Sequence, residues 1–261
     1  MDKVFSLFRY LYYLINAKDE HSLHSPFVYT LYTEVISPPN QYYIFQKIEA
    51  LRESLKASGR TICVKDFGAG SKSLTGKIRK VSDIAARSEK PARQAQALFR
   101  LVNYFKPQTI LELGTSLGLT TLYLASPSSK NKVISFEGCP ETLSIAQENF
   151  AKFGIKNIET VEGNLDETLP QKLKQLNKVD FVFFDANHRY APTISYFHQC
   201  LKKAHEDSVF VFDDIHWSKE MEMAWNEIKA HPEVMITIDL FFLGLVFFRK
   251  KQPKQHFVLK F

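Results

Sequence analysis

The chain has 261 residues, of which 45% are hydrophobic and 24% charged, with only 10 Gly and 11 Pro. This composition excludes collagen-like, low-complexity and wholly disordered chains. It is typical of a globular protein with one main domain and, at most, one appendage. No apolar run approaches the roughly 18 residues that a membrane-spanning helix needs, so we expect no transmembrane segment.

The amino-terminal apolar run and the cysteines both indicate a cytoplasmic protein. The run from Val4 to Ile15 contains Arg9 and several Tyr residues, and no small-residue cleavage site follows it, so we predict no signal peptide. The three cysteines (Cys63, Cys139 and Cys200) are odd in number and form no CxxC pair. A disulfide scaffold or a cysteine-based zinc site is therefore not expected.

The net charge of +6 is unevenly distributed along the chain. Residues 1–106 hold 17 basic and 9 acidic side chains (net +8), whereas residues 107–261 hold 17 and 19 (net −2). The stretch from Arg60 to Arg100 alone has ten basic and three acidic residues (net +7). Such a stretch is either a solvated basic face or a contact for nucleic acid or phosphate.

Residues 1–106 are predicted to form a mostly helical extension or lid. Apolar residues recur at three- and four-residue intervals from Phe5 to Ile15, which indicates a helix. Pro26 and the pair Pro38-Pro39 interrupt this pattern. Further helices are expected over 46–58 and 92–105, with a short strand beginning at Thr61 and a polar, basic segment over 72–91.

Residues 107–261 are predicted to form an α/β domain. Short apolar runs alternate with helical patterns, and this alternation indicates right-handed crossovers and a parallel sheet. The last two runs surround Gly244 and suggest an antiparallel closing pair. We therefore predict a doubly wound, mostly parallel sheet of seven strands, at 109–114, 133–137, 158–163, 179–185, 208–214, 235–241 and 244–250.

Five successive strand ends carry a carboxylate or a glycine, at the edge where such sheets bind ligands. The first ends in Glu112-Leu-Gly114 and is followed by Thr115, Ser116, Leu117 and Gly118. The later ones end in Glu137-Gly138, Glu162-Gly163-Asn164, Asp185 and Asp213-Asp214. Glycines allow the backbone to approach a ligand, and an acidic residue 25 positions after Glu112 can accept both hydroxyls of a ribose.

The glycine spacing is GxxxG rather than the GxGxxG of dinucleotide sites, so it suits a nucleoside cofactor without a pyrophosphate. The segments ILELGTSLG, VISFEG and VDFVFFDANHRY resemble the first motif, the ribose-binding strand and the fourth motif of class I S-adenosylmethionine-dependent methyltransferases. The resemblance covers roughly Pro107–Phe261 and implies a Rossmann-like fold. It also implies that S-adenosylmethionine is the cofactor, bound by Glu112, Gly114, Thr115, Ser116, Gly118, Glu137, Gly138, Asn164 and Asp185.

Within that superfamily the chain is most similar to metal-dependent O-methyltransferases of the caffeoyl-CoA and macrolide or sugar type. The resemblance implies that Asp185, Asp213 and Asp214 hold a divalent cation. Three converging carboxylates would repel unless protonated or bound to a cation, and an all-oxygen set suits Mg²⁺, Mn²⁺ or Ca²⁺. Alternatively, Asp185 contacts only the cofactor, and Asp213 and Asp214 cap a helix.

Asp185, His188 and His216 are the candidate catalytic residues. Each histidine lies two or three residues after a metal-type Asp and could accept a substrate proton near neutral pH. The alternative for each is a hydrogen bond to an Asp that fixes the loop, and we expect one of the two to have that role. The segment DFGAGS (66–71) also follows a strand, but no second acid-ending strand follows, so we predict a substrate-side or lid loop there.

The chain departs from the family pattern in two places: Glu206-Asp207 replaces the usual Gly-Gly before the fifth strand, and Asn187 stands where an acid is common. The leading hypothesis is methyl transfer to a small-molecule hydroxyl. One alternative is an RNA methyltransferase, favoured by the basic stretch. Another is a cofactor-binding fold used as a non-catalytic interaction module, whose aromatic amino-terminal helices dock a partner or a membrane surface. The apolar amino-terminal stripe suits a homodimer interface.

Overall fold

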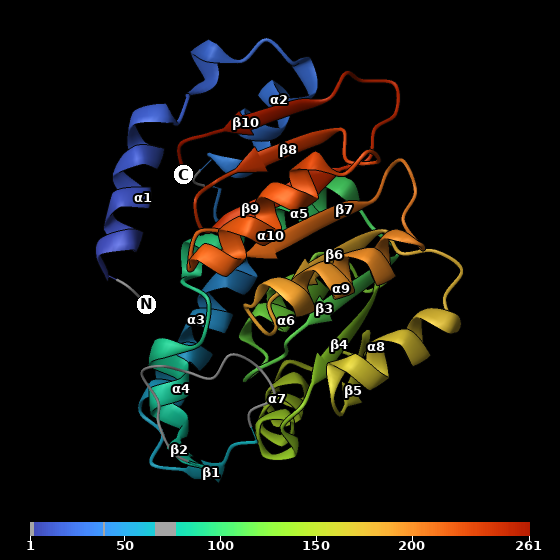
Figure 1. Ribbon diagram of the computed structural model, residues 1–261. Coiled ribbons are helices and arrows are strands. Elements are labelled where there is room, and N and C mark those ends of the chain that lie inside the picture. The colour runs from blue at the N-terminus through green and yellow to red at the C-terminus, as the bar shows by residue number, and fades with distance from the viewer. Residues whose placement is uncertain (1–2, 39, 66–76) are drawn as a thin grey trace. The chain divides into compact units, whose positions relative to one another are not determined.

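The computed structural model describes residues 3–38, 40–65 and 77–261 (Figure 1). The DFGAGS segment lies outside the described residues. None of the described helices is both long and apolar enough to cross a bilayer. The chain divides into two compact units, residues 1–38 with 173–261 (unit 1) and residues 39–172 (unit 2). Residue 106, where we predicted the boundary between the helical extension and the α/β domain, lies inside unit 2.

Helices and strands alternate along most of the chain. In chain order unit 1 begins with α1 (Lys3–Asn16), η1 (Glu20–Ser22), α2 (Pro26–Leu31) and η2 (Tyr32–Ile36). Unit 2 follows with α3 (Tyr43–Lys56), β1 (Thr61–Cys63), β2 (Ile78–Lys80), α4 (Val81–Arg87), α5 (Ala92–Phe105), β3 (Thr109–Leu113), α6 (Leu119–Ala125), β4 (Lys132–Glu137), α7 (Pro140–Phe153) and β5 (Ile158–Glu162). After α8 (Leu165–Lys174), unit 1 resumes with β6 (Phe181–Phe184), α9 (Tyr190–Leu201), β7 (Val209–Asp213), α10 (Lys219–Ala230), β8 (Ile236–Asp239), β9 (Leu243–Phe247) and β10 (Gln255–Val258).

Eight of these strands belong to one mostly parallel sheet, which confirms the predicted doubly wound α/β class. In unit 2 the order is β3-β4-β5, all parallel, with α6 and α7 as the crossovers. In unit 1 the order is β10-β8-β9-β7-β6, in which β6 and β7 are parallel and β9 is antiparallel to both neighbours. The antiparallel pair around Gly244 is therefore confirmed.

The sheet has one strand more than the seven predicted. The additional strand, β10, pairs in parallel with β8 at the edge of the sheet. Its sequence, Gln-His-Phe-Val, is short and half polar and follows Pro253 and Lys254. Because an edge strand buries little apolar surface, it leaves a weak hydrophobic pattern in the sequence.

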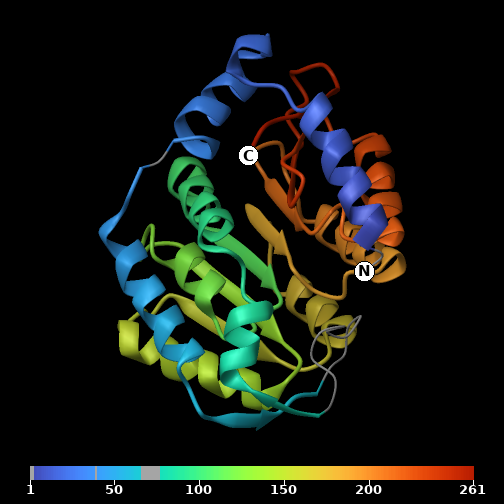
Figure 2. The same cartoon turned by 90° about the vertical axis from the view of Figure 1, so that its left-hand side faces the viewer.

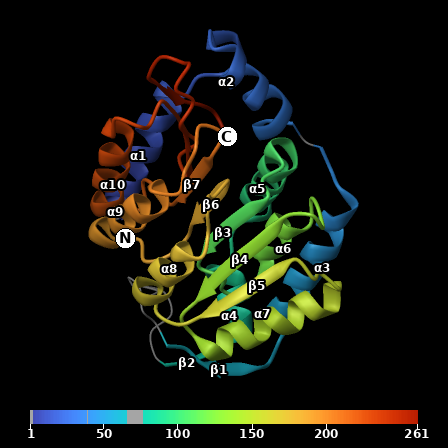
Figure 3. The ribbon, with the colours of Figure 1, turned by 90° about the vertical axis from the view of Figure 1, so that its right-hand side faces the viewer.

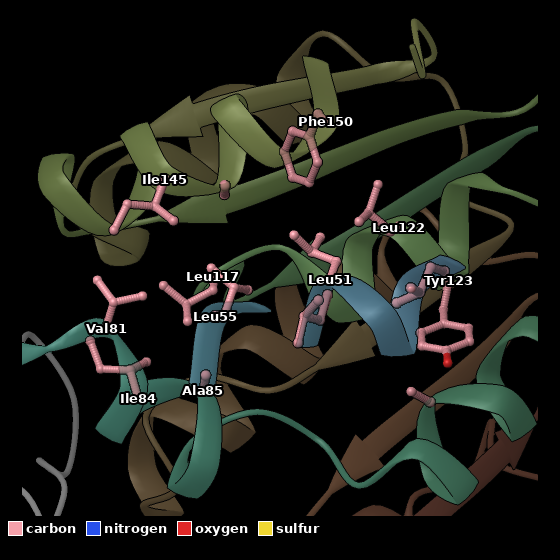
Figure 4. Packing of buried hydrophobic residues seen from close by; sticks show 14 of the residues in the cluster. Leu51, Leu55, Val81, Ile84, Ala85, Leu117, Leu122, Tyr123, Ile145 and Phe150 are labelled. Atoms are coloured by element: carbon pink, nitrogen blue, oxygen red, sulfur yellow. The ribbon is translucent and has the colours of Figure 1, made fainter. Parts of the chain in front are cut away.

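Unit 2 has a core formed where its helices meet (Figure 4). Leu51 and Leu55 of α3 lie against Val81 and Ile84 of α4, and this layer faces Phe150 of α7. Figure 3 shows α7 running along β5. Residues within 45–62 and 81–99, expected to belong to the helical extension, thus supply much of the core of unit 2.

Unit 1 has an aromatic core beneath α9 and α10. The rings of Phe184 and Phe212 stack at 4.2 Å between centroids, and Trp225 of α10 is fully buried beside Phe212. A Cβ at Gly244 would lie 2.7 Å from the Trp225 ring, so this position in β9 requires glycine. Figure 2 shows α1 alongside α10, where Arg9 of α1 forms an ion pair with Glu222.

Candidate functional site

The glycine-rich loop between β3 and α6 has a backbone that other residues could not readily adopt. Gly114, Ser116 and Gly118 all have positive φ, at 112°, 50° and 83°. A Cβ at Gly118 would lie 2.5 Å from Cε1 of Phe150, so glycine is required for both the turn and the close approach of α7. The amides of Gly114 and Thr115 donate to the carbonyl of Phe136, which ties the loop to the end of β4.

Glu137 ends β4 and holds the same loop from the other side. Its Oε2 accepts a hydrogen bond from the Ser116 amide and its Oε1 accepts one from the Cys139 amide, both at 2.9 Å. The side chain is only partly buried. Each carboxylate oxygen has two lone pairs and can accept more than one hydrogen bond.

Glu112 lies beneath the loop rather than on its surface. It is fully buried, and its Oε2 accepts hydrogen bonds from Thr121 of α6 at 2.5 Å and Ser135 of β4 at 2.6 Å. Ser135 also bonds Thr115 at 2.6 Å. This network joins β3, β4 and α6, so the geometry gives Glu112 a supporting role toward the loop.

Asn164 caps α8. Its side-chain oxygen accepts a hydrogen bond from the Asp166 amide at 3.1 Å, and its carbonyl accepts bonds from the amides of Glu167 and Thr168. Gly163, immediately before it, has a φ of 130°. The Asn164 side chain therefore fixes the turn after β5, and the cofactor contact that we expected from Asn164 stays a prediction.

Glu89 contacts the glycine-rich loop, and sequence reasoning did not select it. Its Oε1 accepts a hydrogen bond from the Leu117 amide at 2.9 Å. One feature of the sequence could have indicated it: Glu89 is an acidic residue in an otherwise basic stretch, two residues before Pro91 and the helix predicted over 92–105. In that stretch Arg60 pairs with Glu148, and Arg100 is buried, so not all of the basic side chains form a free cationic face.

Unit 1 brings Asp185, His188 and Asp213 together. One ligand atom from each lies within 4.8 Å of the others, and Nε2 of His188 is 3.5 Å from Oδ1 of Asp185. The cause is the register of the parallel strands β6 and β7, in which Phe184 lies opposite Phe212. The next residue after each of these, Asp185 and Asp213, therefore lies at the carboxyl end of its strand, and the two are neighbours across the sheet.

The structure groups His188 with the two aspartates and does not include Asp214 in that set. Asp214 has a φ of 52°, its amide donates to the carbonyl of Phe242, and its own carbonyl accepts from the Trp217 amide. The ring of His188 lies 5.8 Å from that of Trp217. Asp214 thus starts a tight turn that places Trp217 beside His188.

His216 is hydrogen-bonded to an aspartate, the alternative role considered for one of the two histidines. Its Nε2 lies 2.7 Å from Oδ2 of Asp239, and its ring stacks on Phe241 at 5.3 Å. The other oxygen of Asp239 accepts from the Phe241 amide at 2.8 Å. Because His216 is only 7% exposed, this geometry favours a role in joining the loops after β7 and β8. Asp239, a sixth strand-end carboxylate, was not selected from the sequence because it lies in the closing antiparallel pair.

The chain is similar to known methyltransferases in sequence and in fold. Residues 111–215 match a family model described as a methyltransferase domain. Over 125 residues the chain is 28% identical to a catechol O-methyltransferase from Niastella koreensis, covering 47% of this chain and 56% of that protein. The chain spans little more than half the length of the first curated relatives it matches.

Solved structures show the same fold. An O-methyltransferase from Bacillus cereus in complex with SAH has a TM-score of 0.54 at 18% identity, over 84% of this chain and 96% of the other. The O-methyltransferase TomG from Streptomyces achromogenes in complex with SAM has a TM-score of 0.54 at 18% identity, over 61% and 81%. The resemblance to class I methyltransferases of the O-methyltransferase branch is thereby confirmed.

Proposed function

We propose that this protein transfers the methyl group of S-adenosylmethionine to a hydroxyl oxygen of a small molecule, assisted by a divalent cation. The proposal is supported above all by the convergence of Asp185, His188 and Asp213 at the ends of β6 and β7. These residues lie within the stretch that matches the methyltransferase model. The curated relatives named catechol O-methyltransferase support an aromatic hydroxyl as the first acceptor to test.

The donor set fits a divalent cation. Two carboxylate oxygens and one imidazole nitrogen within 4.8 Å of one another are of a size that one ion with bonds of about 2.1 Å can span after small adjustments. The nitrogen donor shifts the preference from Mg²⁺ and Ca²⁺ toward Mn²⁺ and other first-row ions. We propose Asp185, His188 and Asp213 as the ligands, in place of the set with Asp214 expected from sequence.

When bound, the cation would polarise the acceptor oxygen and lower the pKa of its hydroxyl. Asp185 and Asp213 would supply the negative charge that holds it, and the Trp217 ring lies 5.8 Å from the His188 ring. In unit 2, Glu137 would accept the ribose hydroxyls of the cofactor, while the loop over 114–118 brings its backbone close to the ligand. The chain's share of catalysis is then mainly alignment of the oxygen with the sulfonium methyl group.

Calorimetric titration of S-adenosylhomocysteine and, separately, of Mn²⁺ and Mg²⁺ tests the two halves of this proposal. We expect the nucleoside to bind the wild-type protein and to bind more weakly to Glu137→Gln. We expect Mn²⁺ to bind and its heat to disappear in Asp213→Asn, with catechol methylation lost in chelator. Nucleoside binding without any cation response would contradict the metal assignment, and absence of nucleoside binding would contradict methyl transfer.

A further inference from the structure

Helix α1 exposes a continuous apolar face. Six large side chains on it, aliphatic or aromatic, are each about half exposed or more: Leu7 (59%), Phe8 (70%), Leu11 (48%), Tyr12 (58%), Leu14 (47%) and Ile15 (83%). They form two rows with i, i+4, i+7 spacing, one starting at Leu7 and one at Phe8, which together make a wide stripe along the helix. Single exposed apolar residues are ordinary, but a contiguous patch of this kind marks an interaction site.

The opposite face of α1 is firmly built into unit 1, so the outward direction of the stripe is fixed. Tyr13 is 4% exposed, and its hydroxyl donates to the carbonyl of Leu259 at 2.5 Å. Tyr10 and Tyr13 both pack on the ring of Phe241, at 4.9 and 5.3 Å. Arg9 forms an ion pair with Glu222 of α10.

The charge pattern distinguishes between possible partners. Helix α1 (Lys3–Asn16) holds two charged residues, Lys3 at its first position and Arg9, whose side chain pairs with Glu222 and lies over the Tyr12 ring. Helices that lie on membranes carry several Lys or Arg residues that meet anionic lipid headgroups, whereas none of the six residues of the stripe is charged. An uncharged, self-similar stripe instead matches a second copy of itself, as in the isologous interfaces of two-fold dimers.

The area of the stripe is also what a dimer needs. Six large side chains with these exposed fractions present on the order of 700 Å² of apolar surface. A standard specific interface buries about 800 Å² on each partner, with a more apolar centre than rim. We propose that α1 is the interface of a homodimer in which the stripe of one copy packs against that of the other, an inference independent of the proposed methyl transfer.

Sedimentation equilibrium of the full chain between about 1 and 100 µM tests this proposal. The monomer mass is 30.1 kDa, and we expect the wild-type protein to approach twice that mass. The double variant Phe8→Lys/Ile15→Lys places charges on both rows and should weaken association at least 100-fold. The matched control Met223→Lys changes an equally exposed apolar residue on α10 (57%) and should still dimerise.

Hydrogen exchange on the wild-type protein gives a second measurement that does not depend on a variant folding. We expect amide protection over residues 5–16 to increase with protein concentration, while protection over α10 stays constant. A wild-type protein that remains monomeric over the whole range, or a double variant that dimerises normally, would overturn the proposal. A monomer that sediments with phosphatidylcholine or phosphatidylserine vesicles would overturn it in favour of a lipid surface.

Discussion

The two compact units use their strand-end carboxylates differently. In unit 2, Glu112 accepts hydrogen bonds from hydroxyls of α6 and β4, and Glu137 accepts one from a backbone amide of the glycine-rich loop and one from the Cys139 amide. In unit 1, Asp185 and Asp213 lie close to each other and to His188. A carboxylate at the end of a parallel strand can therefore either shape a loop or join a ligand cluster. Only the three-dimensional neighbours distinguish these roles, because the sequence pattern is the same.

The largest expected effect tests the cluster itself. Asp213→Asn removes a negative charge from the proposed cation site, and we expect a loss of catechol methylation on the order of 10³-fold, about 4 kcal/mol. The neighbouring Asp214→Asn, outside the cluster, should cost less than tenfold. Initial rates with saturating Mn²⁺ measure both. Equal losses in the two variants would show that the sequence-based set including Asp214 is the better one.

The second effect concerns the loop of unit 2. We expect Gly118→Ala to lower the free energy of unfolding by about 2–4 kcal/mol, because the new Cβ meets Phe150 and the residue has positive φ. Gly154→Ala has positive φ with nothing within 4 Å, so it should cost only about 1 kcal/mol. Urea unfolding curves measure the difference. Similar costs would mean that α7 yields readily to the added methyl group.

The third effect separates cofactor binding from loop support. We expect Glu137→Gln to weaken binding of S-adenosylhomocysteine by about 10–100-fold, because a hydrogen bond to a charged group contributes a free energy of that size. Glu141→Gln is the matched control, since Glu141 accepts a bond from the Cys63 amide and lies on α7. Calorimetry gives both dissociation constants. Full affinity in Glu137→Gln would assign this carboxylate to loop support alone.

The smallest effect is a dependence of stability on pH that belongs to unit 1, which holds all eight histidines. Partial burial, with His198 nearby, lowers the pKa of His231 below its usual 6.5. The unfolded chain therefore takes up a proton before the folded one, and stability should fall as the pH drops below about 6.5. We expect less than 1 kcal/mol, because the ring keeps some solvent contact. Unfolding of wild type and His231→Gln at pH 7.5 and 5 measures this, and a variant as pH-sensitive as the wild type would contradict it.

The sequence was sufficient for the α/β class and for the strand ends that carry Asp185 and Asp213. Short apolar runs that alternate with helical patterns are typical of buried parallel strands, and all residues of β6 and β7 are buried. The sequence was not sufficient for partners that come from distant segments. The bond between His216 and Asp239 spans 23 residues, and the one between Glu89 and Leu117 spans 28. The edge strand β10 and the place of residues 39–106 in the core of unit 2 depend on tertiary packing in the same way.

Because unit 1 is made of two separate segments of the chain, it can be completed only late in synthesis. Helix α1 is synthesised before unit 2, yet Leu259, which accepts the hydrogen bond of Tyr13, lies 246 residues after it, and Lys18 forms its bridge with the same residue. Unit 2 is contiguous and can fold while the rest of the chain is still being translated. Until Leu259 emerges, the face of α1 that packs in unit 1 therefore lacks this contact in the nascent chain. In that interval the chain would most need a chaperone that shields exposed apolar surface.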